Sequence, residues 1–158
     1  MKFALIPMLV LSLALQEVPR SINWGALVPA GDEAASAGDP TEISHDTVGK
    51  QSGSDRPVRS LDGEYIRMPG FMLPLDYTEE GMVTAFLLVP YYGACIHVPP
   101  PPPNQIVFVK TEASPVRSKG LWDPVWVTGT LLVAPYDNDL GDAAYTLTLD
   151  KIEPYTED

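Results

Sequence analysis

Five consecutive prolines, Pro99 to Pro103, restrict what this chain of 158 residues can fold into more than any other feature. Each proline ring fixes φ and removes a backbone donor, so the run can neither pair as a central strand nor form a helix. The residues directly before it are apolar and aromatic, and they read Val89-Pro-Tyr-Tyr-Gly-Ala-Cys-Ile-His-Val98. The sequence therefore predicts a rigid, aromatic-rimmed loop as the place where function resides.

Cys95 and His97 are the second feature of this loop, because the chain holds one cysteine and two histidines in all. In an extended backbone, side chains at i and i+2 point to the same face. A thiolate and an imidazole on one face suit Zn²⁺ or copper, so the pair predicts a metal site with zinc as the candidate cofactor. A zinc site needs three or four protein ligands. Others would come from a partner protein, a linker acid, or His45, Asp76, Glu79 or Glu80.

Two other roles for the pair remain open. In the first, Cys95 is a small buried packing residue and His97 hydrogen-bonds a turn carbonyl. In the second, Cys95 is a nucleophile or His97 a base in an enzyme. The enzyme is the less favoured alternative, because no oxyanion-hole motif follows Cys95 and the chain has no Cys-x-x-Cys for thiol–disulfide exchange.

The proline run also offers a docking edge for a partner protein. The rings of the two preceding tyrosines would pack on the prolines and hold the loop in place. We predict five partner-binding residues along this edge: Tyr91, Tyr92, Pro99, Pro101 and Asn104.

The sequence from Leu61 onward is typical of β-structure, with short apolar runs, alternating segments and turn residues between them. Pro69-Gly70 predicts a bulge or bend in the first strand, and Gly129 predicts a barrel bend in the fourth. Five strands in this arrangement favour an all-β, OB-like Greek-key barrel over a sandwich, which needs more strands. The predicted strands cover residues 65–73, 85–89, 106–109, 125–133 and 145–149.

The N-terminus resembles a secretory signal peptide, because Met1-Lys2 precedes an apolar run from Phe3 to Leu15 that is too short to span a bilayer. We expect export to the periplasm and cleavage between residues 14 and 20, leaving no membrane span. The predicted organisation is a signal peptide within 1–20, an extension and polar linker over 21–60 and the barrel over 61–158. Within the extension, Ile22 to Pro29 should be an apolar anchor around Trp24.

The charge balance limits the class of partner. The chain has 10 basic and 21 acidic residues, a net charge of −11. Such a surface repels phosphate backbones and anionic membranes, and it favours cations and basic partners. Nucleic-acid binding, which an OB-like barrel would otherwise suggest, is therefore not expected.

One long element resembles the signature of a bacterial domain-of-unknown-function family, the one numbered 3299. It reads Leu87-Leu-Val-Pro-Tyr-Tyr-Gly-Ala-Cys-Ile-His-Val-Pro-Pro-Pro-Pro-Pro-Asn-Gln-Ile106, and further segments fit at 24–29, 61–75, 125–129 and 144–155. The resemblance implies an exported protein of Gram-negative bacteria without an assigned activity. Members are often encoded beside ABC-transporter components and, in some genomes, with metal-responsive genes.

Together these features predict a periplasmic binding or accessory protein that presents the Cys95–His97 turn. The resemblance implies partners among the components of an envelope ABC-type transport system and a link to zinc homeostasis. Two alternatives stay open at this point: an envelope enzyme that depends on Cys95 or His97, and a structural protein-interaction module without metal.

Overall fold

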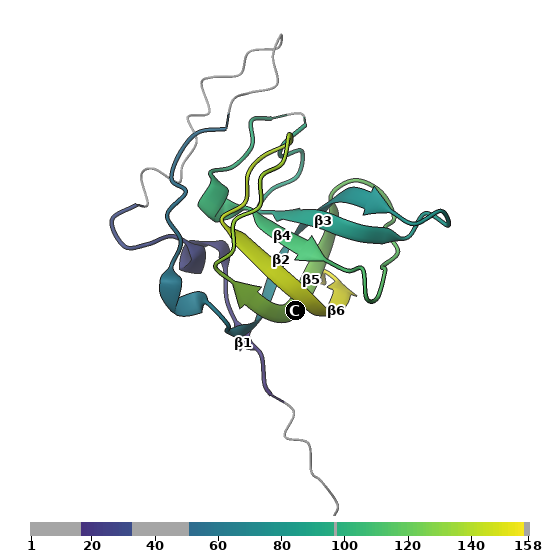
Figure 1. Ribbon diagram of the computed structural model, residues 1–158, viewed down its shortest axis with the longest axis horizontal. Helices are drawn as coiled ribbons and strands as arrows, with labels where there is room; N and C mark the ends of the chain where they lie inside the picture. The colour runs from purple at the N-terminus through teal and green to yellow at the C-terminus, as the bar shows by residue number, and fades with distance from the viewer. Residues whose placement is uncertain (1–16, 33–50, 97, 157–158) are drawn as a thin grey trace, which may run out of the picture.

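Five strands close into a barrel in the computed structural model of this chain, and a sixth short strand lies on its outside (Figure 1). The structure describes residues 17–32, 51–96 and 98–156. The strands are β1 (Arg20–Ser21), β2 (Tyr65–Tyr77), β3 (Val83–Val89), β4 (Val107–Lys110), β5 (Asp123–Leu132) and β6 (Tyr145–Pro154). Three 3-10 helices accompany them: η1 (Trp24–Leu27), η2 (Arg59–Leu61) and η3 (Pro103–Gln105). None of the helices in the described ranges has the length and apolar character needed to cross a membrane.

The strands follow the order β2-β3-β4-β6-β5 around the barrel, and β5 pairs again with β2 to close it. Neighbouring strands of the barrel are antiparallel except β4 and β6, which run parallel from the pair Val107 and Tyr145 to the pair Lys110 and Thr148. A parallel pair requires a long crossover, and here β5 and its two connections provide it. The predicted OB-like, five-stranded Greek-key barrel is therefore confirmed, with β1 as an additional outer strand.

The barrel interior is a continuous apolar core to which every barrel strand contributes. Along β2 and β5 every second side chain points into the barrel, because successive side chains of a strand point to opposite faces. This alternation is what identified the segment after Val125 as a strand in the sequence. The largest buried side chains in this core include Tyr145, Phe86, Ile66, Met68, Met72, Leu88, Leu131 and Leu147.

The N-terminal extension packs onto this barrel through the predicted apolar anchor. Ile22 and Leu27 are buried in the barrel core, and Trp24 packs against it. The Tyr145 hydroxyl donates to the carbonyl oxygen of Leu27 at 2.8 Å and accepts from the amide of Val58 at 2.6 Å. One buried tyrosine of β6 thus holds two segments of the extension. Residues 1–16 of the predicted signal peptide lie outside the described residues.

The bend predicted at Gly129 is present. The register between β5 and β6 shifts between Thr128 and Gly129. A Cβ on Gly129 would lie 2.1 Å from the carbonyl oxygen of Thr148, so only glycine allows the two strands to approach this closely.

The sequence predicted a bulge or bend at Pro69-Gly70, and no bulge is present there. The register of β2 with β5 runs without a shift through both residues, and the irregularity lies instead between Pro74 and Tyr77, opposite β3. Along one edge of β2, the pairing with β1 ends at Arg67 and the pairing with β3 begins at Phe71. Pro69 lies between these two stretches, where that edge has no partner strand in the described part of the chain. The missing backbone donor of Pro69 therefore costs no hydrogen bond between strands. Gly70 is needed for packing, because a Cβ there would lie 2.7 Å from Cγ of Leu88.

Candidate functional site

A second apolar cluster lies on the outer faces of β2, β3 and β4, separate from the barrel interior. Along β3, Phe86 and Leu88 point into the barrel, whereas Ala85, Leu87 and Val89 belong to the outer cluster. This strand is buried on both faces, as its continuous apolar run predicted. The outer cluster is completed by Leu73, Ala94, Cys95, Ile106, Phe108, Trp122 and Ala143. The loop that contains the prolines is therefore a cover over one side of the barrel.

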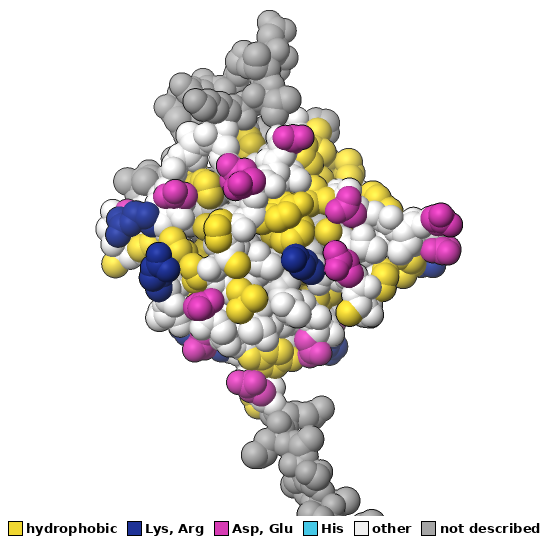
Figure 2. Space-filling view, in the orientation of Figure 1, with side chains coloured by type: hydrophobic (Ala, Val, Ile, Leu, Met, Phe, Trp, Pro, Cys, Tyr) yellow, Lys and Arg dark blue, Asp and Glu magenta, His cyan; other side chains and the backbone are white. Residues whose placement is uncertain are grey.

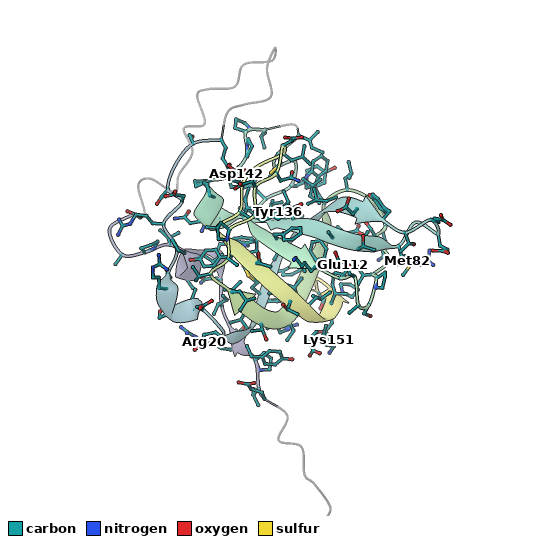
Figure 3. All side chains as sticks on the ribbon, in the orientation of Figure 1. Arg20, Met82, Glu112, Tyr136, Asp142 and Lys151 are labelled. Atoms are coloured by element: carbon teal, nitrogen blue, oxygen red, sulfur yellow. The ribbon has the colours of Figure 1, made fainter. Side chains whose placement is uncertain are left out.

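The connection between β5 and β6 forms the other part of this cover. The ring of Tyr136 lies flat on the ring of Phe108, with centroids 3.6 Å apart and planes 2° from parallel. Figure 3 labels Tyr136 over the sheet, in front of the strands. Gly141 of the same connection lies against the proline loop, because a Cβ built on it would be 3.0 Å from Cβ of Pro100 and 3.6 Å from Sγ of Cys95.

Cys95 is buried beneath these two loops, with 1% of its surface exposed. Its φ of 70° places it in the left-handed region, so the backbone is not extended there and the alternation argument for Cys95 and His97 does not apply. Burial raises the pKa of the Cys95 thiol to about 12. At neutral pH the thiol is protonated, and the thiolate that metal binding or nucleophilic attack requires is not available.

The other predicted ligands, His97 and His45, lie outside the described residues. Within the described ranges, no group of three or more histidine, cysteine, aspartate or glutamate side chains is placed to hold a metal ion. The zinc site at Cys95 and His97 therefore stays a prediction. It would require the loop to open, so that the Cys95 thiol could meet a metal and lose its proton.

The proline run is less exposed than a docking edge requires. Pro100, Pro101 and Pro102 are buried, and Pro99 is half-buried. The carbonyl oxygen of Pro101 accepts from Nε2 of Gln51 at 2.9 Å, and the same amide group exchanges two hydrogen bonds with the backbone of Asp142. Pro101, one of the five predicted partner-binding residues, thus faces the protein interior and is not accessible to a partner.

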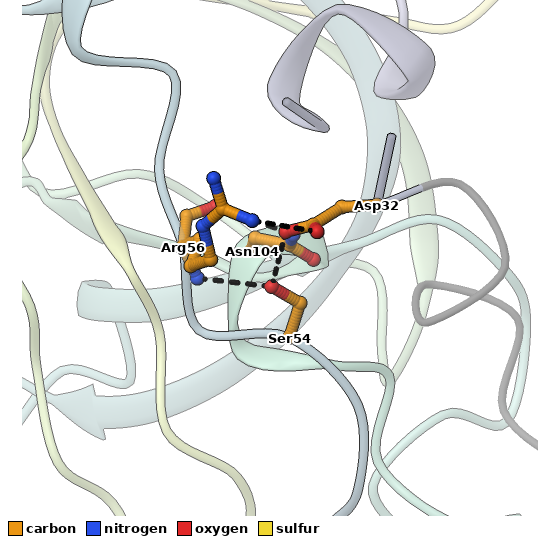
Figure 4. A network of polar contacts seen from close by, with 4 residues as sticks. All are labelled: Asp32, Ser54, Arg56 and Asn104. Atoms are coloured by element: carbon orange, nitrogen blue, oxygen red, sulfur yellow. Dashed lines mark hydrogen bonds and ion pairs between the residues drawn. The ribbon is translucent and has the colours of Figure 1, made fainter. Parts of the chain in front are cut away.

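Asn104 is buried as well, and it connects the end of the proline run to the extension (Figure 4). Its amide Nδ2 donates to the carbonyl oxygen of Arg56 at 3.3 Å, and its backbone amide donates to the carbonyl oxygen of Ser54 at 3.2 Å. Asp32 holds the same segment, accepting from Ser54 Oγ at 2.7 Å and from Arg56 Nη1 at 2.9 Å. Asn104 therefore has a structural role, and the structure does not offer it to a partner.

Tyr91 and Tyr92, by contrast, are at the surface, with 41% and 66% of their areas exposed. The hydroxyl of Tyr91 donates to the carbonyl oxygen of Pro99 at 3.1 Å, which agrees with the expectation that this tyrosine holds the prolines. Tyr92 packs elsewhere. Its ring lies 5.0 Å from the ring of Trp122 and meets Phe71 edge-on at 6.4 Å.

Sequence reasoning did not identify Trp122 and Phe71 as part of this site. Trp122 lies directly before β5 with a φ of 57°, and its indole Nε1 donates to the carbonyl oxygen of Ala94 at 3.2 Å. Phe71 comes from the middle of β2, where its outward position follows from the alternation of the strand. No local pattern links either residue to Tyr92, because the three come from different strands and loops.

These residues form an aromatic surface, which we call the Tyr92 surface and define by the exposed Tyr91 and Tyr92, the half-buried Phe71 beside Tyr92, and Trp122 beneath it. The chain as a whole is acidic, with a net charge of −11. In Figure 2, hydrophobic side chains gather over the upper right of the visible face, and carboxylates border them on several sides.

Two comparisons place this chain among known proteins. The model of a family described as "Protein of unknown function (DUF3299)" matches residues 24–154. The crystal structure of a DUF3299 family protein from Pseudomonas aeruginosa PAO1 superposes with a TM-score of 0.71 at 39% sequence identity, covering 90% of this chain and 99% of that one. No curated protein matches the chain.

Proposed function

Because the chain belongs to the DUF3299 family, for which no activity is known, we propose a function from its geometry: a binding protein that docks a partner protein through the Tyr92 surface. The observation that carries this proposal is Tyr92 itself, which is two-thirds exposed although its ring is held by Trp122 and Phe71. A rigid, exposed aromatic ring provides contact area at a low cost in conformational entropy, which is why tyrosine is enriched at binding hot spots.

The alternative of an enzyme has less support from this geometry. The one thiol of the chain is buried and has its pKa raised to about 12, so it is a poor nucleophile at neutral pH. The packing role considered for Cys95 agrees with its place in the outer apolar cluster, between the proline loop and Gly141. This favours an interaction module whose Cys95 stabilises the loop.

The surface also argues against oligonucleotides and oligosaccharides as ligands. OB barrels that bind them use the outer face of their second and third strands. In this chain the corresponding strands are β3 and β4, and the outer cluster with its covering loops occupies that face. The free aromatic surface lies instead around Tyr92, in a protein whose charge opposes phosphate backbones.

We propose a partner with basic groups near an apolar surface, because a net charge of −11 attracts cationic proteins and repels acidic ones. A location in the periplasm and a partner among envelope transporter components are implied by the family resemblance, and they remain part of the proposal. Fractionation of cells that produce the full chain tests the location, and a cytoplasmic protein that retains Met1 would contradict it.

Site-specific photo-crosslinking tests the docking surface. A photoreactive phenylalanine analogue at position 92 should capture a partner in producing cells, whereas the same analogue at position 77 should not. Tyr77 is the matched control, because it is also more than half exposed but lies at the tip of the β2–β3 hairpin.

The captured protein is then purified and titrated against wild type, Tyr92→Phe, Tyr92→Ser and Tyr77→Ser. We expect Tyr92→Ser to weaken binding at least tenfold, which is about 1.4 kcal/mol, and the other two variants to bind as wild type does. Equal binding of Tyr92→Ser and Tyr77→Ser, with both variants folded, would contradict the proposal.

A further inference from the structure

We propose that a cleft at one end of the barrel binds a small organic anion, a monocarboxylate with an aromatic or branched aliphatic body. The cleft has a volume of about 270 Å³ and is lined by β2, β5 and β6 and by the segment that leads into β5. No residue of the Tyr92 surface lines it. The inference is therefore independent of the proposed docking function.

The floor of the cleft is apolar and is continuous with the barrel interior. Met72 and Val125 are buried members of the barrel core, and Ile152 packs against that core. They come together because Met72 pairs with Asp123 across β2 and β5, and Val125 pairs with Pro154 across β5 and β6. Ile152 is half-buried, so an apolar ligand body placed here would cover the surface that this side chain leaves open to water.

The rim of the cleft carries two cationic side chains, Arg117 and Lys119. In the part of the chain that the structure describes, neither side chain is in an ion pair. Cations are scarce in this protein, since 10 basic residues stand against 21 acidic ones. Arg117 and Lys119 both lie beside one apolar cleft, and within the described ranges neither has a carboxylate partner. They are therefore suited to a ligand that carries a negative charge.

The carboxylates at the same rim are already engaged by other groups. Glu153 pairs with Lys151 at 2.9 Å and with Arg67 at 3.8 Å. Asp123 accepts hydrogen bonds from the backbone amide of Lys119 and from Ser118 Oγ, which shapes the turn that carries Lys119. These contacts reduce the repulsion that Glu153 and Asp123 would exert on an incoming anion.

One wall of the cleft is held in place by an aromatic stack. Tyr155 stacks on Trp126 with ring centroids 5.5 Å apart, and the guanidinium of Arg67 lies 4.0 Å above the Trp126 ring. The backbone amide of Tyr155 donates to the carbonyl oxygen of Pro124 at 2.9 Å. The wall therefore needs little ordering when a ligand binds, which lowers the entropic cost of binding.

Size and polarity together select the class of ligand. Pockets for drug-sized molecules span about 300–1,000 Å³, so this cleft suits a smaller one. Inorganic phosphate would leave the apolar floor unfilled, and a neutral hydrocarbon would leave both cations unused. A compact monocarboxylate satisfies both parts, with its carboxylate between Arg117 and Lys119 and its body on Met72, Val125 and Ile152.

The test is a titration of the full chain, labelled with ¹⁵N, with phenylacetate as the probe. We expect saturable shifts of the Val125 and Ile152 amides, with a dissociation constant of about 1 mM or tighter. The double variant Arg117→Gln/Lys119→Gln should bind at least about tenfold more weakly, because the ligand loses two charge-assisted hydrogen bonds. Lys110→Gln is the matched control, since it removes an exposed cation from β4, outside the cleft.

Phenylacetamide is the second control, because it has the same body without the charge, and it should bind at least tenfold more weakly than phenylacetate. Any of three results would overturn the proposal: no saturable shift with phenylacetate, equal binding of the amide, or equal binding by the folded double variant. Tyr92→Ser should bind phenylacetate as wild type does, so failure of the docking function and failure of this site are distinguishable.

Discussion

The indole Nε1 of Trp122 donates a hydrogen bond of 3.2 Å to the carbonyl oxygen of Ala94, and so joins the residue directly before β5 to the loop that leads into the prolines. Both residues are buried in the outer apolar cluster. Tyr92, two residues before Ala94, packs against the same indole, with the two ring planes tilted by 50°. One tryptophan therefore holds the loop from below and supports the exposed ring above it.

Trp122→Phe should lower the free energy of unfolding by about 1–3 kcal/mol, because the buried carbonyl of Ala94 would lose its hydrogen-bond donor. Urea unfolding followed by far-UV circular dichroism measures the change. Trp126→Phe is the control, since Trp126 stacks on Tyr155 at the half-buried outer face of β5 and its loss should cost less. Equal stabilities of the two variants would show that the Trp122–Ala94 bond does not stabilise the fold.

Gly129→Ala should destabilise the barrel by more than about 3 kcal/mol, because the new methyl group would meet the carbonyl oxygen of Thr148 at 2.1 Å and force β5 and β6 apart. Thermal unfolding checks this. In Gly81→Ala, the methyl group would have no neighbour within 4 Å and only the φ of 76° opposes it, so we expect a loss of about 1 kcal/mol. A wild-type melting temperature for Gly129→Ala would contradict the close approach of the two strands.

Alkaline pH should destabilise the wild type more than Cys95→Ala. Burial raises the pKa of the Cys95 thiol from 9.0 to about 12, so the folded chain keeps a proton that the unfolded chain releases. The stability contributed by the buried thiol is complete below pH 9 and is lost as the pH rises from there toward 12. Between neutral pH and about pH 10.5, the wild type should lose roughly 2 kcal/mol more than Cys95→Ala.

Urea unfolding at several pH values measures this difference. Parallel stability curves for the two proteins would mean that the Cys95 thiol ionises as readily in the folded chain as in the unfolded one.

Measuring the affinity for Zn²⁺ distinguishes a buried, protonated Cys95 thiol from the metal site predicted at Cys95 and His97. We expect Cys95→Ser to bind Zn²⁺ at pH 7.4 as the wild type does, because the thiol is protonated and covered. Calorimetric titration of protein purified without affinity-tag histidines measures the affinity, and His97→Ala completes the series. Wild-type affinity tighter than roughly 10 μM that is lost in both folded variants would establish the Cys–His metal site instead.

The sequence predicted the fold class well, but it did not predict the extent of the candidate site. Alternation along the strand after Val125 and the apolar run of β3 report directly on which faces are buried, because the side-chain period of a strand is local. Gly129 likewise marked a real bend. The glycine of Pro69-Gly70 also suggested an irregular strand, but it is present for a different reason. A larger side chain at Gly70 would collide with Leu88 and Trp24, which come from other elements.

By itself, then, the sequence determined an all-β barrel, a proline loop that cannot join a strand or helix, and an acidic surface. Only the tertiary structure decided which parts of that loop reach solvent. Cys95 turns inward through a positive φ, Pro101 and Asn104 are buried against the extension, and Tyr92 rests on Trp122. The physical reason is that local patterns set the period of each strand, whereas burial of a loop depends on the distant segments that barrel closure brings against it.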